Sequence, residues 1–112
     1  MSNKSDRRFS MSIVNSNCLY KHWIHSYEED EQGKKVYRPS NFEFPLSFGR
    51  DGFEIKKTGE IILYIPGMDD GIEERIGQFQ IRDSDKIEVN THGRHFTITV
   101  LLCETDRLVV SK

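Results

Sequence analysis

Apolar and polar side chains alternate with a period of two along most of the second half of the chain. In 96-FTITV-100, for example, Phe96, Ile98 and Val100 are separated by two threonines. Successive side chains of a β-strand point to opposite faces, so this pattern is typical of a strand with one buried and one wet face. Long apolar segments at helical spacing are absent from the sequence. It therefore predicts an all-β domain of antiparallel strands.

Short turns separate the alternating segments. Thr58-Gly59, 83-DSD-85 and 92-HGR-94 interrupt the pattern, and turns of this length and composition join neighbouring antiparallel strands as hairpins. We therefore expect the order along the chain to match the order in space. About eight strands in such an up-and-down order can close into a small β-barrel that has no open edges.

The length of 112 residues is enough for one domain with one core. Residues 1–17 are polar and without a sustained period, which predicts a flexible N-terminal tail before a barrel domain over 18–112. The segments 39–52 and 66–75 are longer than hairpin turns and are expected to be loops, the second with at most one helical turn over 69–75. Such loops form a binding lip at a barrel end or are variable surface loops.

Composition excludes several partners. The formal net charge is -2, so no basic surplus offsets nucleic-acid phosphates. No apolar run of about 18 residues predicts a membrane span, and the N-terminus lacks the apolar segment of a secretory signal. We therefore expect a cytoplasmic protein in which Cys18 and Cys103 are thiols. A disulfide is the alternative if a closed sheet makes the two cysteines neighbours.

The stretch 19-LYKHWIHSYEED-30 concentrates aromatic, histidine and acidic side chains. On a strand, Trp23, His25 and Tyr27 share one face, while His22 lies on the other. We expect Trp23 to anchor the core, which directs His25 and Tyr27 inward.

No metal, cofactor or catalytic residue is assigned. His22 and His25 lie on opposite faces of a regular strand, and His92 and His95 lack a third ligand. The motifs of nucleophilic enzymes are absent. An acid–base role of His25 with Glu28 is a minor enzymatic alternative, and a core histidine satisfied by a hydrogen bond is the commoner outcome.

Arginines and acids form a second pattern. Arg38 and Arg50 can each pair with Glu28, Glu29 or Glu54, because a guanidinium matches a carboxylate through two parallel hydrogen bonds. Such pairs would brace the long loop over the barrel. A small anion would bind there instead if one arginine were left free.

The order of these segments resembles that of small bacterial lipocalin-like (calycin-type) domains. The features that carry the resemblance are a first strand with Trp23, the unit 53-FEIKKTGEIILYI-65, a midway 77-GQF-79 and a closing strand 107-RLVVS-111. Phe79 stands where the family often has Trp. The segments 25-HSYEED-30, 37-YRP-39 and 49-GRDGFE-54 are similar to a group of small bacterial proteins of unassigned function. The resemblance covers most of residues 19–111 and implies a small barrel without a defined ligand.

The first function hypothesis is a soluble β-barrel binding module for a small ligand. We expect this ligand to be partly apolar, and an anionic ligand is one alternative. Its expected ligand contacts are Trp23, His25, Tyr27, Arg38, Arg50 and Glu54. The alternative is a protein-interaction or inhibitor module, in which the apolar residues of 39–52 are exposed anchors: Phe42, Phe44, Leu46 and Phe48. A monomer and a homodimer both remain open.

Overall fold

The computed structural model describes residues 17–47, 49–67 and 71–112. Its elements are η1 (Asn17–Leu19), β2 (His22–His25), η2 (Tyr27–Glu29), β3 (Lys34–Pro39), β4 (Gly52–Ile55), β5 (Glu60–Pro66), β6 (Ile72–Arg82), β7 (Lys86–Thr91), β8 (Arg94–Cys103) and β9 (Leu108–Ser111). The two helices, η1 and η2, are single 3-10 turns, which confirms the all-β prediction. Within the described ranges, no helix has the length and apolar character needed to cross a membrane.

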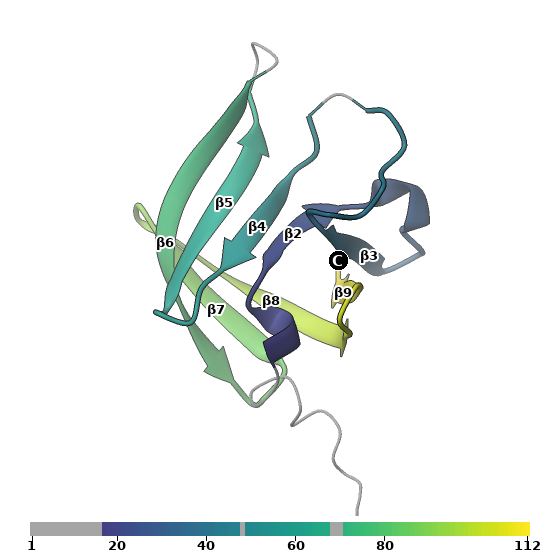
Figure 1. Ribbon diagram of the computed structural model, residues 1–112. Coiled ribbons are helices and arrows are strands. Elements are labelled where there is room, and N and C mark those ends of the chain that lie inside the picture. The colour runs from purple at the N-terminus through teal and green to yellow at the C-terminus, as the bar shows by residue number, and fades with distance from the viewer. Residues whose placement is uncertain (1–16, 48, 68–70) are drawn as a thin grey trace, which may run out of the picture.

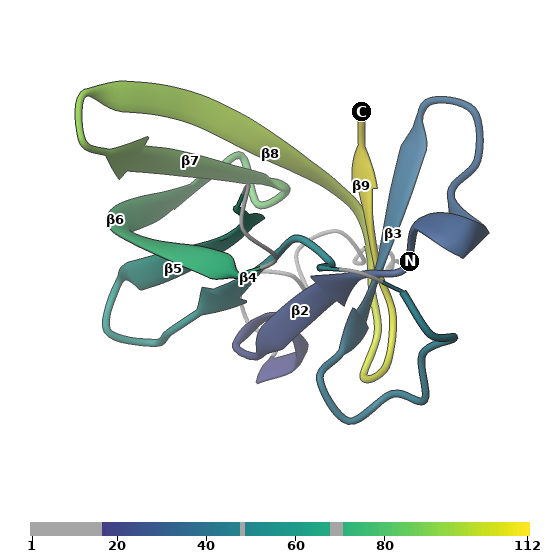
Figure 2. The ribbon, with the colours of Figure 1, turned by 90° about the horizontal axis from the view of Figure 1, so that it is seen from above.

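The eight strands close into one antiparallel barrel in the order β2-β3-β9-β8-β7-β6-β5-β4 (Figure 1). From β4 to β9 each strand pairs with the next one in the chain, as the short turns predict. Seen from above, β3 and β9 lie on one side of the barrel and β5 and β6 on the other (Figure 2). The predicted fold class, a closed antiparallel barrel of about eight strands, is confirmed.

One connection does not join neighbouring strands. β2 pairs with both β3 and β4, and β3 pairs with β9. The segment 40–51 must therefore pass β2 to reach β4, and its described part, 40–47 and 49–51, lies along the arch at the upper right of Figure 1. This segment has no regular secondary structure in its described part.

Gly52 makes the pairing of β2 with β4 possible. A Cβ atom at this position would lie 2.2 Å from the Trp23 carbonyl oxygen, so any other residue would push the two strands apart. Gly52 is opposite Ile24 in the ladder. This close approach places Asp51, the residue before it, beside the end of β2.

One end of the barrel is plugged by η1. Leu19, at the end of that helix, and Trp23 are both fully buried, and the Trp23 Nε1–H donates to the Leu19 carbonyl at 3.0 Å. Ile55, Ile61 and Leu108 are at most 2% exposed in the same core. The expected role of Trp23 as a core anchor is confirmed. Figure 1 shows η1 as the purple turn below β2.

Cys18 and Cys103 form a disulfide between η1 and the end of β8, with their Cα atoms 6.4 Å apart. The expectation of free thiols is therefore wrong. It rested on the assumed compartment, whereas closure of the barrel brings together two positions that are 85 residues apart in the chain. The cytoplasmic location stays a prediction, and disulfides persist mainly in oxidising compartments.

The segment 66–75 is largely strand rather than loop. β5 runs to Pro66 and β6 starts at Ile72, and these two residues are opposite each other in the ladder. The helical turn predicted over 69–75 is wrong for Ile72 onward, because Ile72–Arg82 is strand β6 and pairs with β5. Residues 68–70 lie outside the described residues. The predicted tail also lies outside them, except that Asn17 begins η1.

The disulfide should hold η1 in the end of the barrel. Replacing both cysteines with serine is expected to lower the free energy of unfolding by about 2–4 kcal/mol, because the unfolded chain is no longer cross-linked. Chemical denaturation with and without a reductant measures this. The reductant should destabilise only the original protein. Ready alkylation of two thiols in the folded, non-reduced protein would contradict the assignment.

Candidate functional site

The end of the barrel opposite η1 holds an apolar cavity of about 310 Å3. Its apolar lining comes from four strands, β4, β5, β8 and β9, and includes Phe53, Leu63, Phe96, Ile98 and Val110. Phe96 is 38% exposed although it belongs to the inward-facing set of β8. We call this cavity the barrel mouth.

Two lysines line the barrel mouth, Lys35 from β3 and Lys112 after β9. Neither ammonium group forms an ion pair with any residue in the described ranges. The Lys35 Nζ lies 5.9 Å from the centre of the Tyr37 ring. The charged side chains that line the mouth are thus two lysines without an ion pair in the described ranges and one carboxylate, Asp51.

Tyr37 also lines the barrel mouth and is 4% exposed. Burial raises the pKa of its hydroxyl group, and the negative charges of Asp51 and Asp30 raise that pKa further. The hydroxyl is therefore a neutral donor at physiological pH, and it has no hydrogen-bond partner among the described residues.

His25 connects the mouth to the end of the long connection. Its Nδ1 lies 2.9 Å from the Asp51 Oδ1, and its Nε2 lies 2.9 Å from the Asp30 Oδ2. Carboxylate oxygens only accept, so both contacts are hydrogen bonds when both ring nitrogens carry a proton. The ring also stacks on Tyr37 with centroids 5.0 Å apart. His25 is 9% exposed, as its predicted inward direction requires.

Tyr27 does not follow His25 into the barrel. β2 ends at His25, and Tyr27 lies in η2 with 47% of its surface exposed. Its hydroxyl contacts the Ser47 Oγ of the long connection. The inward placement of Tyr27 was wrong because the alternation of faces stops where the strand stops.

Arg50 fastens the long connection to the end of β2. Its two Nη atoms donate to the Glu28 carboxylate at 2.9 and 2.5 Å, and also to the carbonyls of His25 and Pro45. The guanidinium lies 4.7 Å from the Tyr27 ring centre and 4.8 Å from that of Phe44. With 8% of the side chain exposed, Arg50 has its charge and donors occupied.

Arg38 forms the second brace. Its Nε and Nη2 donate to the Glu29 carboxylate at 2.8 and 2.6 Å, and its Nη1 donates to the Asp106 carbonyl. The guanidinium lies 4.8 Å from the Phe42 ring centre. Hydrogen bonding by Arg38 is the main cause that lowers the pKa of Glu29 to about 2. Both arginines are therefore paired, and the bracing interpretation is confirmed.

The four predicted anchors of the long connection differ in exposure. Phe42 and Phe44 are partly buried against the two arginines and each other, with ring centroids 4.9 Å apart. Leu46 is fully exposed, and Phe48 lies outside the described residues. Only Leu46 among the described anchors is free to contact a partner.

Glu54 lies on the outer face of β4 and borders a second hollow rather than the mouth. It accepts a hydrogen bond from the Tyr64 hydroxyl at 3.1 Å. Tyr64 helps to line an outer groove of about 440 Å3, which lies between the 40–51 connection and the outer faces of β2, β4, β5 and β6.

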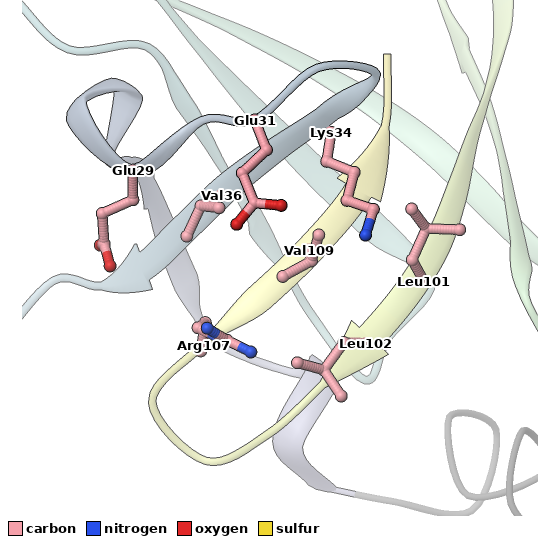
Figure 3. Close-up of a pocket in the computed structure, with 8 residues that line it drawn as sticks. All are labelled: Glu29, Glu31, Lys34, Val36, Leu101, Leu102, Arg107 and Val109. Atoms are coloured by element: carbon pink, nitrogen blue, oxygen red, sulfur yellow. The ribbon is translucent and has the colours of Figure 1, made fainter.

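A third hollow of about 240 Å3 lies on the outer faces of β3, β8 and β9 (Figure 3). Its floor is Val36 and Val109, and the remaining lining residues include two acids and two bases: Glu29, Glu31, Lys34 and Arg107. Figure 3 shows these charged side chains around the two valines. The balanced charges favour neither an anion nor a cation.

The residues that line the mouth were mostly missed from the sequence. Lys35 lies two residues before Tyr37, and Lys112 two residues after Val110. Alternate residues share a face, so this spacing could have predicted that both lysines face the mouth. Asp51 carried no such signal, because its position depends on the long connection. In the described part of the chain, no three His, Cys, Asp or Glu side chains are grouped in a way that could hold a metal ion.

Comparison of the chain with protein-family models, with curated proteins and with solved structures found no match.

The Arg38–Glu29 pair should contribute to stability. Replacing Glu29 with Gln is expected to lower the free energy of unfolding by roughly 1–2 kcal/mol at pH 7, because it removes a charged acceptor of two guanidinium hydrogen bonds at a partly exposed site. Replacing Glu43, an exposed acid of the 40–51 connection, with Gln is the matched control. Chemical denaturation of both variants measures the difference, and equal stabilities would contradict the brace.

Acid should weaken the same pair. The pKa of Glu29 is lowered from 4.5 to about 2, so its charge stabilises the fold above pH 4.5, and this contribution is lost as the pH falls toward 2. The melting temperature of the E29Q variant should therefore fall less steeply over this range than that of the original protein.

Proposed function

We propose that the protein binds a small amphipathic anion in the barrel mouth. The apolar part of the ligand would enter the cavity, and its negative group would remain at the edge beside Lys35 and Lys112. The observation that carries this proposal is an apolar cavity whose two lysines have no ion pair within the described residues.

The size and lining of the mouth suit this class of ligand. Its volume of about 310 Å3 is at the lower end of the roughly 300–1,000 Å3 of small-molecule sites, which are mostly apolar with a few placed polar groups. Burial of the apolar part contributes about 25 cal/mol per Å2 removed from water. The Tyr37 hydroxyl adds a neutral donor for an anionic oxygen.

His25 has an indirect part in this proposal. Asp51 lines the mouth and would repel an anion, but its carboxylate is 2.9 Å from the His25 Nδ1. This contact holds the Asp51 carboxylate at the His25 ring, and the two lysines outnumber this one carboxylate among the charged side chains that line the mouth. His25 is then a positioning residue, and Trp23 maintains the closed end.

A lipocalin-like classification belongs to the same proposal. The barrel is plugged at one end and hollow at the other, which is the arrangement that a ligand-holding barrel of eight strands needs. The resemblance of 53–65 and 107–111 to lipocalin-like domains supports it from the sequence side. The sequence suggested six ligand contacts, and this proposal does not use four of them: Tyr27, Arg38, Arg50 and Glu54. The polar contacts proposed instead are Lys35, Lys112 and Tyr37.

Binding of decanoate tests the proposal. Titration calorimetry should detect one site, and the charge reversal K35E should weaken the affinity about tenfold, since an attraction becomes a repulsion. The reversal K34E is the matched control, because Lys34 is the adjacent lysine and lines the outer hollow on the other face of β3.

A second variant tests the cavity. L63W should fill the mouth and abolish binding of decanoate, while a melting temperature close to that of the original protein would show that the barrel still forms. Absence of decanoate binding to the original protein, or equal losses in K35E and K34E, would refute the proposal.

A further inference from the structure

The outer groove and the barrel mouth lie on opposite faces of the sheet, and three residues line both of them: Asp51, Gly52 and Tyr64. Along β4, Phe53 faces the mouth, whereas Gly52 lies in the floor of the groove and Glu54 shares its outward direction. The opposite wall of the groove is Phe44, Ser47 and Arg50 of the long connection. A molecule in the groove would thus contact the outside of the sheet and the inner side of this connection.

The uncompensated charge of the groove is negative. Glu74 lines it and has no cationic partner in the described part of the chain. Glu54 contacts the lining residue Tyr64, and among the described residues its carboxylate accepts only the Tyr64 hydroxyl hydrogen. The one lining arginine, Arg50, is compensated by Glu28. The groove is therefore opposite in sign to the mouth, where the unpaired groups are lysines.

Aromatic side chains form much of the groove. The rings of His22 and Tyr64 are stacked with centroids 4.5 Å apart, and Phe44 faces them from the long connection. Burial and the hydrogen bond to Glu54 raise the pKa of Tyr64 to about 12, so its ring remains a neutral phenol. The face of such a ring attracts a cation.

Carboxylates beside aromatic faces are the chemistry that recognises an organic ammonium group. We infer that the outer groove is a second binding site, for a small molecule that carries a quaternary or protonated amine next to an aromatic or other apolar part. The ammonium would lie between Glu74 and the Tyr64 ring, and the apolar part would pack against Ile24, Ile72 and Phe44. This site differs from the one proposed in the mouth in its unpaired charged groups, although Asp51, Gly52 and Tyr64 line both hollows.

Benzyltrimethylammonium is a suitable probe, because its charge does not depend on pH. In 1H–15N spectra of the full chain it should shift the amides of Gly49, Ile72 and Glu74, which line the groove and not the mouth, in a saturable way. E74Q should weaken binding about fivefold through loss of the carboxylate, and Y64L should weaken it by a similar factor through loss of the aromatic face. Phenylpropionate, a matched anion, should not bind in the groove.

E73Q is the control variant. Glu73 is the neighbour of Glu74 in β6, is held by Arg75, and does not line the groove, so its replacement should leave the affinity for the ammonium probe unchanged. The inference is overturned if the probe does not shift the groove amides, if it shifts those of the mouth instead, or if E74Q binds it as tightly as the original protein.

The two sites can be tested separately. K35E should change the affinity for decanoate and leave that for benzyltrimethylammonium the same, whereas E74Q should do the reverse. Loss of decanoate binding alone would refute the function proposed for the mouth and leave the groove site standing.

Discussion

The hydrogen bonds and ring contacts of Arg50 hold the arrangement on which both cavities depend. Because β3 pairs with β9 and not with β4, the chain has to cross β2 between residues 40 and 51. A segment without regular structure must satisfy its backbone and stay in place by other means. Arg50 does this by joining Glu28, the His25 carbonyl and the Pro45 carbonyl in one buried fork.

This crossing produces a residue order with direct consequences. Arg50 is fixed against the end of β2, so Asp51 is within reach of His25, and Gly52 can start β4 against the Trp23 carbonyl. The end of this connection lines both hollows: Asp51 borders the mouth, and Arg50 and Asp51 border the groove. The brace, the histidine contact and both cavities are therefore coupled through three consecutive residues, and a change at Arg50 would affect all of them.

Sequence patterns predicted what depends on local rules. Alternation in 53–65 and 96–102 identified strands, and glycine at positions such as Gly59, whose φ is 97°, marked hairpins. The pairing of arginines with acids was also foreseen, since a guanidinium matches a carboxylate wherever the chain allows it. These inferences need only neighbours in sequence or simple charge matching.

The remaining features depend on closure of the barrel, which local patterns do not encode. The disulfide joins positions from η1 and β8 that only a closed sheet makes adjacent. The prediction that Tyr27 faces inward was wrong because the alternating pattern does not show that β2 ends at His25. Lys35 and Lys112 belong to the inward set by parity, yet a lysine in that set is expected at a solvated strand end unless an opening is known to be there.

The same alternation that builds the core also distinguishes the two proposed sites. Consecutive residues of one strand face opposite sides, so Lys35 contributes to the mouth while Lys34 lies outside, and Phe53 lines the mouth while Glu54 faces outward. A barrel wall one residue thick can in this way present positive charge to its interior and negative charge to its surface. The two proposed sites then need no second domain, because β4 and β5 supply lining residues to both of them.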